Sequence, residues 1–535
     1  MKKLISAASF LLLFAIAPTA AAVDPKWGEI EIVRDKWGVP NVFSSTDAGA
    51  MYGLGYAQAE DRAFQMYYSL RIIQGRTAEV LGNVTKLNGR ETSQDHDKRF
   101  RTIGYYRAAK EVARNLDPET RELLEAFSRG VNDSLQENRD RLVYLFDSLG
   151  LQPEPWTPAD CIASWWHMAQ FFAGDGLNDL ANLHRFSAPA SGPGRGGRGD
   201  RGDRGAPAPN AARIVDDAAA VVQEKDVDKE WVREIEEFVK RYGLKPQRTR
   251  SAGAPKFSHA WVVGGRKSTT GAPVLVSDPQ TPVRNPSLWC EFHIQGKTFN
   301  VRGIGVAGSP IILIGFSEHV AWGVTALGAD QSDLFVLKTD PAHPDSYFFD
   351  GEWRRMQVRE ETIRVKGGRS EKIIVRETHL GPVVTSIAAD VRPGEEVALK
   401  RIPIAEKDRD TVQAGFAMAR ARNIYELLEA VEKWRFPSIN LVAGDRDGNI
   451  AFSVLGAFPI RSSKSNSDGN LAHRGDSSSY DWQGMVPARL VPRVVNPSEG
   501  YLLSGNHRPA ASFYKIPLGL STGAGGRHLA LAKTP

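Results

Sequence analysis

Residues 256–265 read KFSHAWVVGG, and this stretch decides how the rest of the chain is organised. An apolar, strand-like run from Ala260 to Val263 ends in two glycines, and a lone serine, Ser258, stands just before it. No G-x-S-x-G pattern surrounds this serine, so it lacks the sharp turn that exposes the nucleophile of many hydrolases. Two interpretations remain. Ser258 is an ordinary polar residue at the start of a strand, or the chain is cut before it and Ser258 becomes N-terminal.

An N-terminal serine combines a nucleophile and a base in one residue. Its α-amine has an unperturbed pKa of about 7.7–8.0, close to what a general base needs at neutral pH. The amine can take the proton of the hydroxyl without a histidine and an aspartate. Such a site also needs hydrogen-bond donors aimed at the oxyanion of the tetrahedral intermediate. The peptide ahead of the serine must be exposed before it can be cut.

The sequence changes character at Ser258. Before it, apolar residues recur at helical steps over 50–70, 117–135 and 159–186, so we expect a mostly helical α chain over 23–186. After it, strand patterns dominate, several apolar on both faces, as in strands buried inside a layered sandwich. We therefore expect a strand-rich β chain over 258–535, interrupted by a helix near 423–434.

A spacer over 187–257 separates these two parts. It begins with a low-complexity tract rich in Gly, Pro and Arg. Over about 187–226, Gly, Pro, Ala and Arg supply almost no large apolar surface, so we expect no core to form there. An amphipathic helix follows, with Asp228 as its N-cap and Gly243 as its stop. The spacer supplies the exposed peptide that a cut before Ser258 requires.

Residues 1–22 have the features of a secretory signal peptide. Two lysines precede a short apolar run, and Ala20 and Ala22 fit a cleavage site. The run is short for a membrane span, and no second long apolar run follows. We expect a periplasmic or secreted protein with no membrane attachment once the signal is removed.

Charge and cysteine content narrow the choice of partners. The formal net charge is +5, and much of the basic excess lies in the low-complexity tract, where no aromatic residues interleave to stack on bases. We expect no nucleic-acid partner. The two cysteines, Cys161 and Cys290, have no neighbours typical of a catalytic thiol or a metal site. We expect both to be buried small apolar residues, and the sequence does not decide whether they pair.

Several motifs share one order along the chain. They are RDKWGVPNVFSSTDAGAMYGLGYAQAEDRAFQM (34–66), GRTAEVLG (75–82), AFSRGVNDSL (126–135), SHAWVVGGRKSTTGAPVLVSDPQ (258–280), GFSEHVAWGVTALGADQSDLF (315–335), INLVAGDRDGNIAF (439–452) and NPSEGYLLSGNHRP (496–509). In these motifs the chain resembles the penicillin acylase family of N-terminal-nucleophile hydrolases, from residue 27 along nearly its whole length. The resemblance implies an α+β fold, a four-layer αββα sandwich, and a self-processing precursor that matures into an α and a β chain.

The resemblance also implies a set of catalytic residues. Ser258 would be the nucleophile and its freed amine the base, and Gln280 would stand beside it. The oxyanion would be held by the backbone N–H of Ala326 and the side-chain amide of Asn440, and Arg461 would orient the amine and Asn440. Taken singly, Gln280 also fits a turn and Asn440 a polar strand position.

A structural calcium site is implied by the same resemblance. Its ligands would be Asp330, the carbonyl of Ser332 and Asp333, with Asp179 replacing a glutamate from the helical part. Carboxylates and carbonyls are the ligands that Ca²⁺ selects. The alternative is a solvated acidic loop. A separate run, Asp445 to Asn449, has the start of an EF-hand but no downstream glutamate, and we interpret it as a hairpin turn at Asp447-Gly448.

These features predict an amidohydrolase that acts on a small N-acyl amide through a serine acyl-enzyme, with its α and β chains forming a heterodimer. Two alternatives stay open, an N-acyl-homoserine-lactone acylase and an inactive envelope protein. Departures from the family pattern are His259, Phe257 before the cut, and the tail after Gly519, which no longer resembles the family. Because this tail differs from the family pattern, we expect that the C-terminus is truncated.

Overall fold

The computed structural model describes residues 26–84, 91–173, 220–244, 258–388, 394–402, 409–465 and 472–519. The predicted signal peptide, the low-complexity tract and Asp179 lie outside these ranges. The helices are α1 (Asp47–Gln74), α2 (Thr77–Leu81), α3 (Ser93–Ile103), α4 (Tyr105–Arg114), α5 (Pro118–Glu137), α6 (Arg139–Leu149), α7 (Pro158–Ala173), α8 (Lys229–Tyr242), α9 (Arg409–Arg420) and α10 (Ile424–Ala430).

Twenty strands are described, all but two of them after residue 257. They are β1 (Ile30–Arg34), β2 (Pro40–Ser44), β3 (Ser258–Val263), β4 (Val274–Pro279), β5 (Trp289–Gln295), β6 (Asn300–Val306), β7 (Ile314–Ser317), β8 (Val320–Ala326), β9 (Ser332–Leu337), β10 (Ser346–Phe349), β11 (Glu352–Arg355), β12 (Gln357–Ile363), β13 (Glu371–Thr378), β14 (Gly381–Pro382), β15 (Glu396–Arg401), β16 (Ile439–Asp445), β17 (Ile450–Leu455), β18 (His473–Arg474), β19 (Arg493–Val495) and β20 (Tyr501–Ser504).

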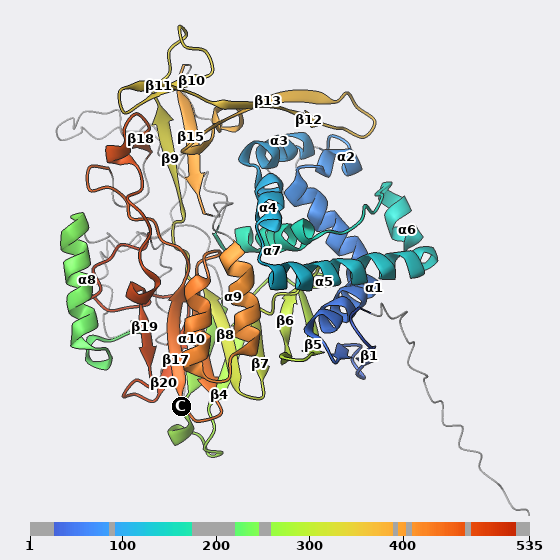
Figure 1. Ribbon diagram of the computed structural model, residues 1–535, viewed down its shortest axis with the longest axis vertical. Coiled ribbons are helices and arrows are strands. Elements are labelled where there is room, and N and C mark those ends of the chain that lie inside the picture. Colours follow the sequence, from blue (N-terminus) through green and yellow to red (C-terminus); the bar gives the residue numbers. More distant parts are fainter. Residues whose placement is uncertain are drawn as a thin grey trace, which may run out of the picture.

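Two sheets face each other at the centre of the molecule. The larger has nine strands in the order β1-β2-β5-β6-β7-β8-β16-β17-β19, and the smaller has the order β20-β3-β4. Helices α1, α7, α9 and α10 contact strands of the larger sheet, while the smaller sheet contacts β8, β16 and β17. Figure 1 shows α1, α5 and α7 grouped on one side and α8 on the other. The described residues thus combine helices and sheets, and they contain one helical layer against two sheets.

The helices of the first half pack closely because glycines remove side chains where α1 and α5 cross. A Cβ on Gly55 would lie 2.1 Å from the carbonyl oxygen of Phe127, and one on Gly130 would lie 1.9 Å from that of Tyr52. No side chain fits at either position without moving a backbone. Asp117 caps α5 and Pro118 occupies its first turn, as the sequence predicts.

Helix α8, within the predicted spacer, is part of the folded structure. Asp228 caps it and Gly243 ends it in the left-handed conformation, as predicted. Its buried Ile235 and Phe238 join the apolar core between the two sheets. The prediction that no core forms between 187 and 226 is wrong for the described end of that range, because Ala220 and Val222 are buried in the same core.

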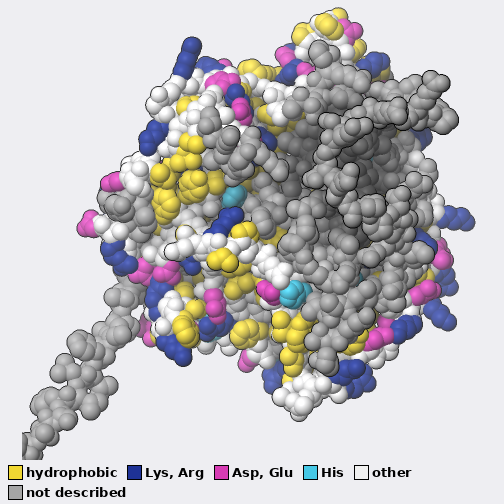
Figure 2. Space-filling model, turned by 180° about the vertical axis from the view of Figure 1, so that it is seen from behind, with side chains coloured by type: hydrophobic (Ala, Val, Ile, Leu, Met, Phe, Trp, Pro, Cys, Tyr) yellow, Lys and Arg dark blue, Asp and Glu magenta, His cyan; other side chains and the backbone are white. Residues whose placement is uncertain are grey.

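The two cysteines are buried, as expected, and the structure shows both as free thiols, a point that the sequence left open. Burial raises the pKa of the Cys161 thiol to about 12 and that of Cys290 to about 11, so both stay protonated at neutral pH. Within the described ranges, no helix is both long and apolar enough to cross a membrane. On the face drawn in Figure 2, basic and acidic side chains are interspersed across the part that is coloured.

Candidate active site

Ser258 is the first residue of β3 and lies between the two sheets. It is 7% exposed, and with Ala260 and Val262 it forms the buried face of the strand. Because alternate residues of a strand point to the same side, the serine faces the larger sheet together with these two core residues. Its backbone N–H donates to the side-chain oxygen of Asn506 at 2.9 Å.

Two polar residues of the larger sheet occupy faces that point toward β3. Asn440 of β16 lies opposite Thr325 of β8 in the antiparallel register. Asn440 shares its face with Val442, which belongs to the core between the sheets, whereas its neighbours Ile439 and Leu441 belong to the core beneath the helices. The Thr325 hydroxyl bonds the hydroxyl of Ser504 on β20 at 2.7 Å. A polar group thus reaches from the larger sheet to the smaller one.

The Asn440 amide has one satisfied end and one unsatisfied end. Its nitrogen donates to the Thr325 hydroxyl at 3.1 Å, and its oxygen has no hydrogen-bond partner among the described residues although the residue is only 1% exposed. An unpaired buried amide group costs about 1–3 kcal/mol. A hydroxyl both donates and accepts, so a turn of the amide keeps the Thr325 bond and directs the nitrogen to the unpaired side. That amide can therefore serve as a donor to an incoming oxygen.

A small apolar cavity adjoins the serine. Its walls include Ser258, Thr325 and Ala326, with apolar side chains completing them: Phe172, Pro279, Leu313, Val324, Pro437 and Ile439. The free volume is about 10 Å³, roughly what one water molecule occupies. Ala326, at the end of β8, lines the same cavity as Ser258. An acyl group would enter only if these side chains moved apart.

Gln280 does not face the serine. It follows Pro279, the register partner of Ser258 across β3 and β4, and it is exposed. Its side-chain nitrogen reaches the carboxylate of Asp278 at 3.4 Å, and the imidazole of His259 lies 3.2 Å from the same carboxylate. These contacts place Gln280 at the rim of the site, on a carboxylate shared with His259.

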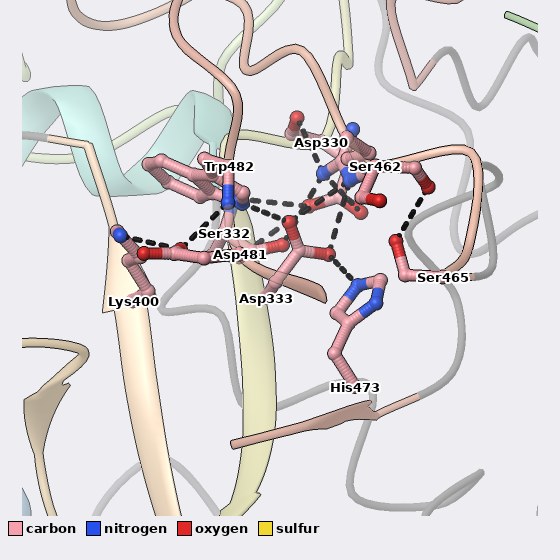
Figure 3. Close-up of polar contacts among 10 residues, drawn as sticks. Asp330, Ser332, Asp333, Lys400, Ser462, Ser465, His473, Asp481 and Trp482 are labelled. Carbon is pink, nitrogen blue, oxygen red and sulfur yellow. Dashed lines mark hydrogen bonds and ion pairs between the residues drawn. The ribbon is translucent and has the colours of Figure 1, made fainter. Parts of the chain in front are cut away.

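Arg461 pairs with the carboxylates of two aspartates. Its guanidinium bonds both oxygens of Asp333 at 2.9 and 3.0 Å and lies 3.2 Å from the carboxylate of Asp330. Its predicted role of orienting the α-amine of Ser258 and Asn440 stays a prediction. Figure 3 shows Asp333 at the centre of this cluster, with His473 and Trp482 also directed at its carboxylate. Their nitrogens donate at 3.0 and 2.6 Å.

The cluster bears directly on the predicted calcium site. Burial alone would raise the pKa of Asp333, but Arg461 and His473 outweigh it and hold that pKa below its usual range. Burial raises the pKa of Asp330 to about 7. The positive charge of Arg461 lowers this pKa, and the negative charge of Asp333 raises it further. Both Asp333 oxygens already accept bonds from the protein, so these residues fit an internal guanidinium better than a metal ion. Within the described ranges no three His, Cys, Asp or Glu side chains form a metal cluster.

Calcium binding therefore stays a prediction. Asp179, the fourth expected ligand, lies outside the described residues. Asp330 and Asp333 lie together as predicted, and Ser332 contributes its carbonyl, but to Arg461 at 3.4 Å. No chemical step below depends on a metal ion.

Three polar residues of the site escape prediction from the sequence. Thr325, Ser504 and Asn506 connect β8 to the segment after β20. Each lies within a motif that carries the family resemblance, but none has a pattern of its own that indicates a role. Only the pairing of β20 with β3 brings the last two beside Ser258.

Comparison with known proteins relates the chain to a group of amide hydrolases. The sequence profile of the penicillin amidase family matches residues 29–533. The acyl-homoserine lactone acylase QuiP of Pseudomonas fluorescens (strain Pf0-1) is 28% identical over 96% of this chain, and the match covers 61% of that relative. The penicillin G acylase of Escherichia coli is 26% identical over 92% of this chain and 61% of its own length.

The chain spans about three fifths of the length of these two relatives. Among solved structures, the thermostable penicillin G acylase of Alcaligenes faecalis is 29% identical, with a TM-score of 0.46, over 51% of this chain and 48% of that one.

Proposed function

Because the chain belongs to the penicillin amidase family, we propose that it is an exported, self-processing hydrolase of linear N-acyl amides, including penicillin-type side-chain amides. The observation that carries the proposal is the position of Ser258. It heads a buried strand and shares a cavity with Ala326, and the Asn440–Thr325 pair occupies the facing sheet. Nucleophile and oxyanion donors thus converge from three strands.

Maturation frees the catalytic amine. The Ser258 hydroxyl attacks the carbonyl carbon of Phe257, and the peptide nitrogen leaves as the acyl group moves to the hydroxyl oxygen. Water then hydrolyses the resulting ester, which releases a carboxylate on Phe257 and a free α-amine on Ser258. The α and β chains remain associated as a heterodimer. Extensive contact between them supports this, because α1 packs on β5 and β2 pairs with β5 across the cut.

Turnover repeats the same chemistry on a substrate. The α-amine takes the hydroxyl proton as Ser258 attacks the substrate carbonyl, and the oxyanion receives the backbone N–H of Ala326 and the amide of Asn440. The amine product leaves with the proton, an acyl ester remains on Ser258, and water releases the acid. Apolar side chains around the cavity suit the acyl part of the substrate better than a charged group.

We further propose that the complete fold is the four-layer αββα sandwich of N-terminal-nucleophile hydrolases. Two facing sheets and one helical layer support this. An N-acyl-homoserine lactone is the second candidate substrate, because several relatives carry that acylase name. Its scissile bond is also a linear amide, so the mechanism is unchanged.

One experiment separates the candidates. The purified protein is incubated with a chromogenic phenylacetyl anilide and, in parallel, with N-acyl-homoserine lactones of several chain lengths, and the released acid is quantified. The Ser258→Ala variant is the control for contaminating activity. We expect hydrolysis of at least one amide class by the wild type and none by the variant. No hydrolysis by a correctly cut wild type would contradict the proposal, and an inactive wild type that stays uncut would favour the uncleaved, inactive envelope protein.

A further inference from the structure

The side chain of Asn506 joins two parts of the candidate site. Its oxygen accepts the backbone N–H of Ser258 at 2.9 Å, and its nitrogen donates to the carbonyl of Ala326 at 2.7 Å. These two bonds fix the orientation of the amide, because only the oxygen can accept and only the nitrogen can donate. The residue lies 248 positions from Ser258 and was assigned no role from the sequence.

We infer that Asn506 positions the α-amine of Ser258 for its work as the general base, an inference that rests on the function proposed above. After the cut, the Ser258 nitrogen stays at the start of β3 but becomes an amine with two N–H groups and one lone pair. An acceptor that holds one N–H restricts rotation of the amine and keeps the lone pair available to the hydroxyl. The same amide anchors the peptide carrying Ala326, so base and oxyanion donor are fixed to one side chain.

The backbone at Asn506 shows that the segment is built around this side chain. Its φ of 61° lies in the left-handed region, where non-glycine residues are uncommon and asparagine is enriched. The preceding N–H of Gly505 donates to the ring of His507 at 3.1 Å, and Ser504 bonds Thr325. The bonds of Ser504 and Asn506 therefore hold the turn after β20 against the site, and the bond of Gly505 shapes the turn itself.

A hydrogen-bond acceptor also affects the basicity of the amine. Accepting from the ammonium favours the charged form, so Asn506 raises the amine pKa relative to an amine without that partner. Removing the amide should lower this pKa, and replacing it by a carboxylate should raise it. A role limited to folding predicts neither shift.

The test compares Asn506→Gly and Asn506→Asp with a matched control, Asn496→Gly. Glycine tolerates a positive φ, so it removes the amide without straining the turn. Asn496 is the matched control because it also has a positive φ, 49°. Its side-chain oxygen accepts the N–H of Ile450 at the start of β17, and the residue lies outside the site. Each protein is checked for cutting by mass spectrometry and for folding by thermal melting, and kcat and KM are then measured from pH 5 to 10.

A positioned general base increases the reaction rate by about 10²- to 10⁴-fold. We expect the Asn506→Gly substitution to remove part of this increase and to lower kcat by at least about tenfold. KM should stay within about threefold, because the substrate binding surface is intact. In the plot of kcat/KM against pH, the acidic limb should move to lower pH in Asn506→Gly and to higher pH in Asn506→Asp. The profile of Asn496→Gly should match that of the wild type. Unchanged kcat and pH profiles in both Asn506 variants would overturn the inference alone. An uncut, inactive wild type would overturn it together with the proposed function.

Discussion

Replacing Asn440 by alanine should separate catalysis from folding. Asn440 donates one hydrogen bond, to Thr325, and its amide oxygen is buried without a partner in the part of the chain that the structure describes. Losing the bond costs about 0.5–1.5 kcal/mol, and removing the unpaired oxygen returns about 1–3 kcal/mol. Thr325 keeps its bond to Ser504. The free energy of unfolding should therefore fall by no more than about 0.5 kcal/mol, and the same ranges allow a rise of up to about 2.5 kcal/mol.

The effect on turnover should be much larger. An oxyanion donor acts only when the substrate oxygen becomes anionic, so its loss appears in kcat. Removing one such donor costs about 2.7–4 kcal/mol, which is about 10²–10³ in rate. The assay is steady-state hydrolysis of a phenylacetyl anilide by protein whose β chain begins at Ser258, with urea denaturation of the same samples.

Ser453→Ala provides the control. Ser453 is also buried, lies in the same β16–β17 hairpin and pairs with Leu441, whose side chain lies in the core beneath the helices. It should leave kcat unchanged. If cut, folded Asn440→Ala retained kcat within about threefold of the wild type, where about 10²-fold is expected, Asn440 would not be an oxyanion donor.

Three further predictions concern stability. Asp333→Asn should lower the free energy of unfolding by about 3–5 kcal/mol, because it leaves the buried Arg461 charge without its main partner; urea denaturation measures this, and a loss below about 1 kcal/mol would contradict it. Because Arg461 already pairs with the predicted calcium ligands, EDTA should leave Tm unchanged, whereas a fall in Tm that added calcium reverses would support the calcium prediction instead. Burial lowers the pKa of His167 to about 4, so its share of stability is complete above the unfolded pKa of about 6.5 and is lost as pH falls toward 4, by about 1–3 kcal/mol in all. His167→Gln should flatten that part of the pH–stability curve, and an unchanged slope would show that another group causes it.

Local features of the fold could be predicted from the sequence because short-range chemistry determines them. Asp228 and Gly243 marked the ends of α8, and Asp447-Gly448 marked the turn between β16 and β17. Helix α9 was not predicted, although Val412, Phe416 and Ala419 recur at helical steps and are buried.

The site was predictable only in part, because it is assembled by strand pairing. Ser258, Ala326 and Asn440 were each expected from motifs, and the described structure brings their strands together. Arg461 was expected at the amine from the resemblance, and the motif gave no sign that its guanidinium also pairs with Asp330 and the buried Asp333. Asn506 depends on the pairing of β20 with β3, which no local pattern reveals.

The most direct test of the account is the N-terminal sequence of each polypeptide in the purified protein. The account requires a β chain that begins with Ser258, because only a cut at that bond turns the serine nitrogen into a base. Ser258→Ala should remain a single uncut chain, and Ser258→Cys should still be cut, because a thiol can make the same attack. A wild-type chain that stays whole, or a β chain that begins at any other residue, would contradict the account.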